Sequence, residues 1–336
     1  MGKRDFYFDN AKFILILLVV FGHIISPLKN NHHILFALYI FIFLFHMPAF
    51  ILISGYFCKG FNKPGYIKKT IKRTLIPYFI FQVIYSFYYY FTGYDDHLKL
   101  TLLDPHWSLW FLISIFFWHL AIIPFSKLGK YGFPVAILLG AAIGYFDVFG
   151  SYLSIERTFV FFPFFYLGYL LKNEHFVKLR KSVNKFAAVP ILAGIFMICY
   201  FVFPDAWTEW LLGDSSYADM GIKTWTDGIF RLVFYAGSFL TTFCVMALMP
   251  KTKKSFTKLG QNTLYVYLLH GFFIKTINLS PYYNSIGHKS QYVALFILSI
   301  VIVLLLASKP VREFAKPLVE LKLPQIKRNN TFTRSQ

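Results

Sequence analysis

The sequence predicts an all-helical, polytopic membrane protein with about ten transmembrane helices. Of its 336 residues, 57% are hydrophobic and only 15% are charged, and the mean hydropathy is +0.54. A soluble domain would carry more charge and fewer apolar residues. The formal net charge is +19, but the basic residues lie in short connectors between apolar runs. There they orient helices and meet anionic lipid, so we do not expect a nucleic-acid partner.

Ten apolar stretches are long enough to be interpreted as membrane helices. We interpret the first as an uncleaved helix rather than a signal peptide, because it lacks a small-residue cleavage site and more apolar runs follow it. The fifth and sixth are short and are interrupted by glycine and proline. The predicted spans are residues 11–27, 34–58, 74–93, 108–126, 132–149, 158–172, 186–204, 228–249, 262–279 and 291–308.

The charges of the connectors support this count. Connectors 59–73, 172–185 and 250–261 are rich in lysine and arginine, whereas connectors 94–107 and 205–227 are acidic. By the positive-inside rule, this alternation places both termini in the cytoplasm. We therefore expect a multi-pass protein of the cell membrane, with one membrane domain over residues 1–320 and a disordered basic tail over residues 321–336.

The first span holds two ionisable residues that share a helix face. Lys12 and His23 are eleven residues apart, which places them within roughly 20° of the same face and about 16 Å apart along the axis. Asp9 lies three residues before Lys12. An ionisable group inside a membrane normally faces a wet cavity or a partner. A neutral imidazole can accept a proton from a hydroxyl near pH 7, so we interpret His23 as a general base.

Two further histidines fall inside predicted spans. His46 precedes Pro48 in the motif FHMPAFILISGYF, where Ser54 and Gly55 form a small, polar break that suits close helix packing. His270 lies in the motif LGQNTLYVYLLHG. Each of these histidines is a candidate for the same site as His23.

Charged and aromatic residues at the span ends are candidates for binding. The segment KKTIKRTLIPY is either a positive-inside anchor or a dock for a phosphate-bearing donor. Trp107 and Trp110 either line the mouth of a pocket or belong to an interfacial belt, and Arg157 lies at a helix start that disfavours a cation, so we expect it to have a partner. The acidic connector 205–227, which we expect outside the cytoplasm, carries Trp207, Trp210 and Trp225. These tryptophans form either an interfacial aromatic belt or a surface on which sugars stack.

Other kinds of site are not indicated. The sequence has no GxSxG, Walker A, HExxH or strand-linked GxGxxG motif. His32 and His33 lack a cysteine or carboxylate partner, so we predict no metal site. The three cysteines form neither a CxxC pair nor a disulfide framework.

These motifs, taken together and in order, resemble the membrane-bound acyltransferase family 3, in its fucose 4-O-acetylase-like branch. In that family's first helix, an aspartate precedes an arginine by three residues and a histidine follows the arginine by eleven. Here Asp9 and His23 match, while Lys12 replaces the arginine and keeps the charge without the planar fork. The resemblance is carried by DNAKFILILLVVFGH, FHMPAFILISGYF, KRTLIPYF, HWSLWFL, FFPFFYLGYLL and TLYVYLLHG.

The resemblance implies about ten helices and the transfer of an acyl group, often acetyl from acetyl-CoA, to a hydroxyl of a glycan or lipid-linked sugar. Acyl-CoA would act as a co-substrate rather than a permanently bound cofactor. His23 would deprotonate the acceptor, and Asp9 and Lys12 would orient the donor. His46 and His270 would position the reacting groups or relay protons. Direct transfer and an acyl-histidine intermediate both stay open. The donor phosphates would meet Lys68, Lys69, Lys72 and Arg73, and the substrate-binding residues would be Ser54, Trp107, Trp110 and Arg157.

Two other classes of protein fit the same sequence. A transporter or flippase of lipid-linked glycans would also have many spans and intramembrane histidines, but it would move substrate without consuming acyl-CoA. A sensor or channel subunit is the third option. The sequence does not specify the acceptor, the acyl length or the oligomeric state.

Overall fold

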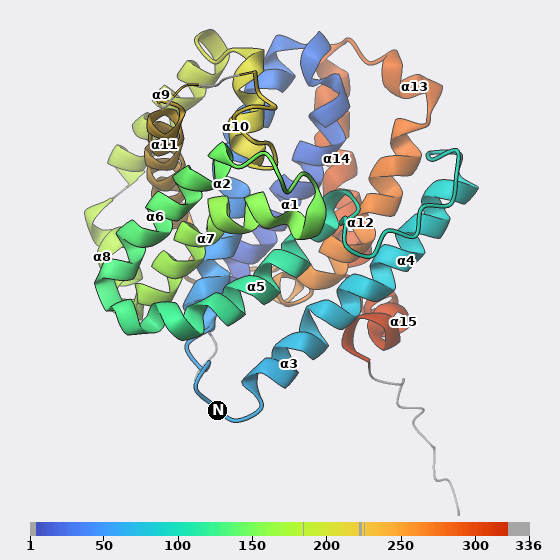
Figure 1. Ribbon diagram of the computed structural model, residues 1–336. Helices are drawn as coiled ribbons and strands as arrows, with labels where there is room; N and C mark the ends of the chain where they lie inside the picture. Colours follow the sequence, from blue (N-terminus) through green and yellow to red (C-terminus); the bar gives the residue numbers. More distant parts are fainter. Residues whose placement is uncertain (1–4, 184, 222–223, 225, 322–336) are drawn as a thin grey trace, which may run out of the picture.

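A computed structural model describes residues 5–183, 185–221, 224 and 226–321, and this part of the chain is helical without strands. Of the predicted tail, 321–336, only Leu321 is among the described residues, and Trp225 lies outside them. Figure 1 shows the helices. They are α1 (Phe6–Ile25), α2 (His33–Phe57), α3 (Tyr66–Arg73), α4 (Leu75–Phe91), α5 (Trp110–Phe125), α6 (Gly132–Ala142), α7 (Ile155–Leu170), α8 (Asn173–Ser182), α9 (Lys185–Phe201), α10 (Thr208–Leu212), α11 (Asp227–Leu248), α12 (Thr263–Asn278), α13 (Pro281–Asn284), α14 (Lys289–Leu306) and α15 (Lys309–Glu320).

Each of the ten predicted apolar stretches coincides with a helix of its own: α1, α2, α4, α5, α6, α7, α9, α11, α12 and α14. Within the described residues, five helical segments are long and apolar enough to cross a membrane, or six if α8 and α9 count as one bent span. The protein is therefore a helical membrane protein. The count of ten spans and the cytoplasmic location of both termini stay predictions.

The fifth predicted stretch, 132–149, is wrong in length. Helix α6 ends at Ala142 and passes through a short 3₁₀ turn that ends at Tyr145. An 11-residue helix rises only about 16 Å, roughly half the thickness of the hydrocarbon core. The ring of Tyr217 lies where a Cβ on Gly144 would stand, so the connector after α10 packs directly onto this turn.

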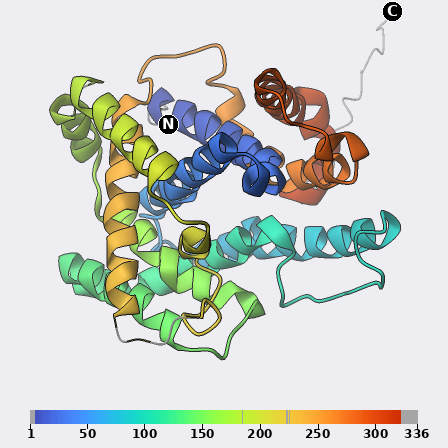
Figure 2. The same ribbon diagram turned by 90° about the horizontal axis from the view of Figure 1, so that it is seen from above.

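Helices α1 and α2 lie at the centre of the bundle, as the view from above shows (Figure 2). Helix α2 packs against α1, α7, α9 and α11, and α1 also packs against α12 and α14. This arrangement buries most of both helices, so the polar groups on α1 and α2 face other protein elements. The site described below is built around these two helices.

The contact between α2 and α7 depends on two glycines. A Cβ on Gly55 would lie 1.9 Å from the carbonyl oxygen of Phe165, and one on Gly168 would lie 2.0 Å from that of Leu52. These backbones approach more closely than any side chain allows. The small, polar break predicted at Ser54 and Gly55 is therefore a packing feature at Gly55.

We expect Gly168→Ala to destabilise the protein, because the added methyl group must push α7 away from α2. The expected loss is about 1–3 kcal/mol of unfolding free energy, the usual range for overpacking. Gly194→Ala is the matched control, since a Cβ on Gly194 would meet nothing within 4 Å in the described structure. Thermal unfolding in detergent measures both variants, and equal stability of the two would contradict the close approach.

Candidate active site

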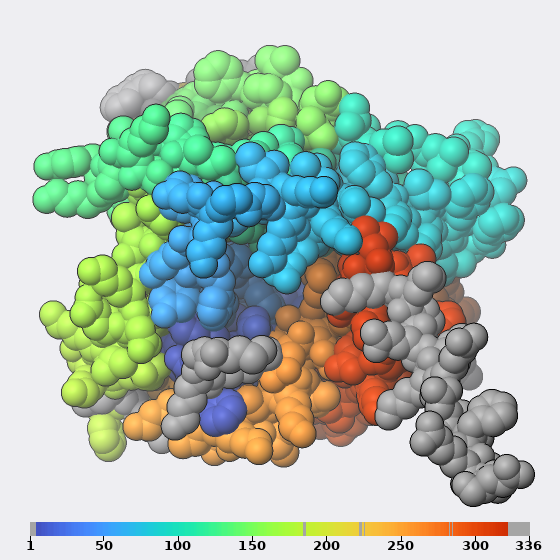
Figure 3. Space-filling model, turned by 90° about the horizontal axis from the view of Figure 1, so that it is seen from below, coloured from blue at the N-terminus to red at the C-terminus, as the bar shows by residue number. Residues whose placement is uncertain are grey.

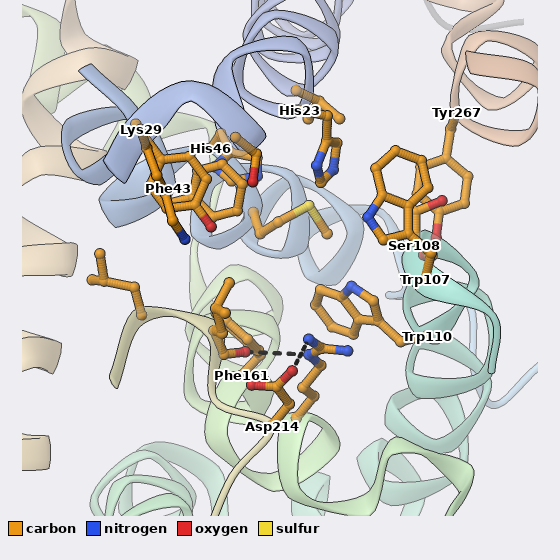
Figure 4. A pocket seen from close by; sticks show the side chains of 17 residues that line it. His23, Lys29, Phe43, His46, Trp107, Ser108, Trp110, Phe161, Asp214 and Tyr267 are labelled. Atoms are coloured by element: carbon orange, nitrogen blue, oxygen red, sulfur yellow. Dashed lines mark hydrogen bonds and ion pairs between the residues drawn. The ribbon is translucent and has the colours of Figure 1, made fainter. Parts of the chain in front are cut away.

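A cavity of about 310 Å³ opens beside α1 and α2, and we call it the histidine cavity (Figure 4). It gathers residues from α1, α2, α5, α7, α12 and the connector after α10, so segments far apart in sequence form one site. Five residues predicted for the site line it: His23, His46, Trp107, Trp110 and Arg157. Its other lining residues are Val19, Ser26, Lys29, Tyr39, Phe43, Met47, Ser108, Phe161, Leu211, Leu212, Asp214 and Tyr267.

His23 projects into this cavity from the last turns of α1. Its ring centroid lies 4.4 Å from that of Trp107, 5.5 Å from that of His270 and 5.7 Å from that of Phe43. Within the described part of the chain, no hydrogen bond engages either ring nitrogen of His23. Aromatic rings therefore hold the imidazole in place, while its nitrogens stay available to a ligand.

The other two histidines are each fixed by a backbone carbonyl. The Nδ1 atom of His46 lies 2.8 Å from the carbonyl oxygen of Ile42, and the Nδ1 atom of His270 lies 2.6 Å from that of Tyr267. A carbonyl oxygen only accepts, so Nδ1 is the donor in both rings and Nε2 is the acceptor when the ring is neutral.

His46 lines the cavity, but His270 lies behind His23 and is fully buried. The Nε2 atom of His270 is buried without a hydrogen-bond partner in the described structure. His270 is thus placed to support His23 rather than to touch a substrate.

Trp107, whose ring packs against that of His23, has a strained backbone conformation. Its φ is +37°, a left-handed value that non-glycine residues rarely adopt. The Nζ atom of Lys275 from α12 lies over the indole ring, 5.3 Å from its centroid. The preceding His106 does not line the cavity, since its Nε2 atom bonds Ser86 at 2.8 Å, and burial lowers its pKa.

Arg157 has the carboxylate partner that its position at a helix start predicts. Its guanidinium forms an ion pair with Asp214 and lies 5.2 Å from the ring centroid of Trp110. Asp214 follows α10 in the acidic connector, and the sequence analysis did not single it out.

Lys29 is a second lining residue that the sequence analysis did not single out. It lies in the 3₁₀ turn Ser26–Asn31, with its Nζ atom 4.4 Å from the ring centroid of Tyr39.

The two described tryptophans of the acidic connector differ in exposure: Trp207 is 37% exposed, whereas Trp210 is packed inside the protein. Trp210 is 3% exposed, and its ring stacks on that of Phe234 in α11. Trp207 packs edge-on against Phe203 and the same Phe234. These two side chains anchor the connector, which in turn carries Asp214 to the cavity.

A second cavity of about 140 Å³, the lysine cavity, adjoins the first. Lys12 and Ser54, both predicted for the site, line it together with Thr263 of α12. Its lining shares Val19, Met47 and Tyr267 with the histidine cavity. Lys12, Val19 and His23 therefore follow one side of α1, which confirms the shared face predicted for Lys12 and His23.

Asp9 lies beside the lysine cavity rather than in its lining. Its carboxylate forms an ion pair with Lys12 at 3.0 Å and accepts a hydrogen bond from Gln261 at 3.3 Å. The side chain is buried, and the Asp9 carbonyl packs tightly on Gly260. The role supported for Asp9 is to hold the Lys12 ammonium in place.

The basic residues around α3 divide between a cavity and the open surface. Lys69 and Arg73 line a polar cavity of about 470 Å³, the basic cavity, whereas Lys68 and Lys72 do not line it, and all four side chains are exposed. Burial raises the pKa of Tyr66 in the same cavity, where its hydroxyl bonds His119. Figure 3 views the face that carries α3.

The lysine cavity and the basic cavity share no lining residue among those described. They approach each other along the last turns of α2, where Ser54 lines the lysine cavity and Phe57 lines the basic cavity. The arrangement is thus three cavities in sequence along α1 and α2, of which the first two adjoin. Starting from α3, they offer the exposed cations Lys69 and Arg73, then the ammonium of Lys12, then the imidazole of His23.

Comparison with known proteins matches residues 5–308 to a family described as "Acyltransferase domain". Nodulation protein NolL of Sinorhizobium fredii is 25% identical over 297 residues, which cover 80% of this chain and 78% of that protein. Nodulation protein NolL of Mesorhizobium japonicum is 44% identical over 62 residues, or 18% of this chain and 17% of that protein. No solved structure matches the chain.

Proposed function

The chain belongs to this acyltransferase family and is a membrane acyltransferase, and from that premise we propose that it moves an acetyl group from acetyl-CoA to a hydroxyl of a cell-surface or lipid-linked glycan. The observation that carries the proposal is the unbonded imidazole of His23 in a cavity that adjoins a second, lysine-lined cavity. Such an arrangement suits two substrates that reach one base from opposite ends. The proposed location is the cell membrane, with the basic cavity facing the cytoplasm.

The donor enters from the α3 side. Lys69 and Arg73 in the basic cavity bind its phosphates, and the exposed Lys68 and Lys72 add to the positive field there. The pantetheine arm passes the end of α2 into the lysine cavity, where Lys12, held by Asp9, and Ser54 meet its amide groups. The thioester then lies near Val19, at the junction with the histidine cavity.

The acceptor sugar enters the histidine cavity from the other side, between Trp107, Trp110 and Arg157. A nitrogen of His23 takes the proton of the acceptor hydroxyl, whose oxygen bonds to the thioester carbonyl carbon. The carbon–sulfur bond breaks, and the leaving thiolate receives the proton from the imidazolium. His46 and His270, each with Nδ1 fixed on a carbonyl, support this proton transfer through their Nε2 atoms.

Release of free coenzyme A from acetyl-CoA by the purified protein in proteoliposomes tests this function. We expect release to rise at least about tenfold when a glycan acceptor is added, and radiolabelled acetyl to appear on the glycan. Translocation of lipid-linked glycan without coenzyme A release would instead identify a transporter and would overturn the proposal.

A further inference from the structure

Lys29 places an unpaired cation in the histidine cavity. Its ammonium lies over the ring of Tyr39, and no carboxylate lies within ion-pair distance among the described residues. Asp205 acts on it electrostatically but forms no ion pair with it. Figure 4 shows Lys29 on the same cavity as His23 and Asp214.

The fixed charges in the lining of this cavity do not cancel. Arg157 is paired with Asp214, whereas no carboxylate in the lining pairs with Lys29, so the lining itself carries one excess positive charge when its histidines are neutral. A half-buried ammonium without a partner is costly to desolvate. A neutral sugar supplies only hydroxyls, which do not compensate a full charge, whereas a phosphate or carboxylate does.

The spacing along the chain sets where the partner anion would lie. Lys29 follows His23 by six residues, which corresponds to about 10 Å along α1 and the 3₁₀ turn that continues it. One sugar ring and its substituent cover such a distance. Trp107 and Trp110 also line this cavity.

We infer that the acceptor is an anionic sugar derivative, whose phosphate or carboxylate binds Lys29 about one sugar ring away from the hydroxyl that His23 deprotonates. The inference rests on the proposed function and adds the chemical class of its acceptor. Lys29 is then the residue that selects a charged acceptor over a neutral one.

Calorimetric titration of the purified protein, without acetyl-CoA, tests the inference with glucose 1-phosphate, glucuronate and methyl glucoside as probes. We expect at least one anionic probe to bind about tenfold more tightly than methyl glucoside, the size of one charged contact. The two anionic probes distinguish a phosphate from a carboxylate. Because no donor is present, the result does not depend on whether acetyl transfer occurs.

Lys29→Met keeps the alkyl chain on Tyr39 and removes the charge, so it should bind all three probes equally weakly. Lys29→Arg should retain the preference, and Lys251→Met, on an exposed connector, should match the unaltered protein. Thermal unfolding verifies that each variant is folded. The inference is overturned if the unaltered protein shows no preference for an anionic probe, or if Lys29→Met keeps that preference.

Discussion

Replacing His23 with glutamine should reduce the rate of acetyl transfer by about a thousandfold, within the range that a general base contributes. Glutamine fills similar space between Trp107 and His270 but cannot accept and return a proton. Because the proposed mechanism places His23 on the acceptor rather than on the phosphates of the donor, the KM for acetyl-CoA should change by less than about twofold. Initial rates of radiolabelled acetyl transfer to a glycan measure both parameters.

The control for this variant is His33→Gln. His33 is exposed at the start of α2, where its ring contacts Tyr200 away from the cavities. We expect it to keep the unaltered rate to within about twofold. If His23→Gln transferred acetyl as fast as His33→Gln, the proton would have to go elsewhere, and His46, which lines the same cavity, would be the next candidate.

Narrowing the junction between the histidine and lysine cavities should have the second-largest effect. Val19 is 2% exposed and lines both cavities. In Val19→Phe the ring should fill this junction and keep the thioester from His23. We expect kcat/KM for acetyl-CoA to fall about a hundredfold, since a displacement of about 1 Å from the reacting position already costs that much. Single-turnover transfer from labelled acetyl-CoA provides the measurement.

Two variants distinguish a blocked passage from a general packing defect. Val19→Ala removes bulk at the same position and should reduce kcat/KM by less than about fivefold. Val293→Phe makes the same chemical change on α14 at a side chain that is 60% exposed, and it should leave transfer unchanged. Normal transfer by Val19→Phe would mean that donor and acceptor do not meet through this junction.

Helical periodicity was enough to predict part of the site. The eleven-residue spacing of Lys12 and His23 correctly placed both on one side of α1, because that helix is regular between them. Helical periodicity also explains why only two of the four predicted basic residues on α3 line the basic cavity. Lys69 and Arg73 are four residues apart on α3 and share a face, so they reach the basic cavity together while Lys68 and Lys72 point elsewhere.

Residues on connectors could not be placed in this way. Lys29 lies in a short turn and Asp214 in a long acidic connector, and neither position has a period that predicts its direction. Asp214 reaches Arg157 only because Trp210 and Trp207 pack the connector onto α11. The sequence showed that Arg157 needs a partner, but tertiary packing determines which carboxylate supplies it.

The pattern of apolar residues could not predict the lengths of the helices either. The run 132–149 is apolar throughout most of its length, yet α6 ends at Ala142 because the chain turns where Tyr217 packs on Gly144. Apolar composition shows that a segment is buried in protein or lipid, but it does not show where the helix stops.

The most direct measurement is an experimental structure of the protein with an unreactive acetyl-CoA analogue in which the thioester sulfur is replaced. The analogue's acyl carbonyl carbon should lie within about 4 Å of the His23 ring, with its phosphates on Lys69 and Arg73 and its arm beside Val19. An analogue that binds with its acyl end outside the histidine and lysine cavities would contradict the meeting of donor and acceptor at His23.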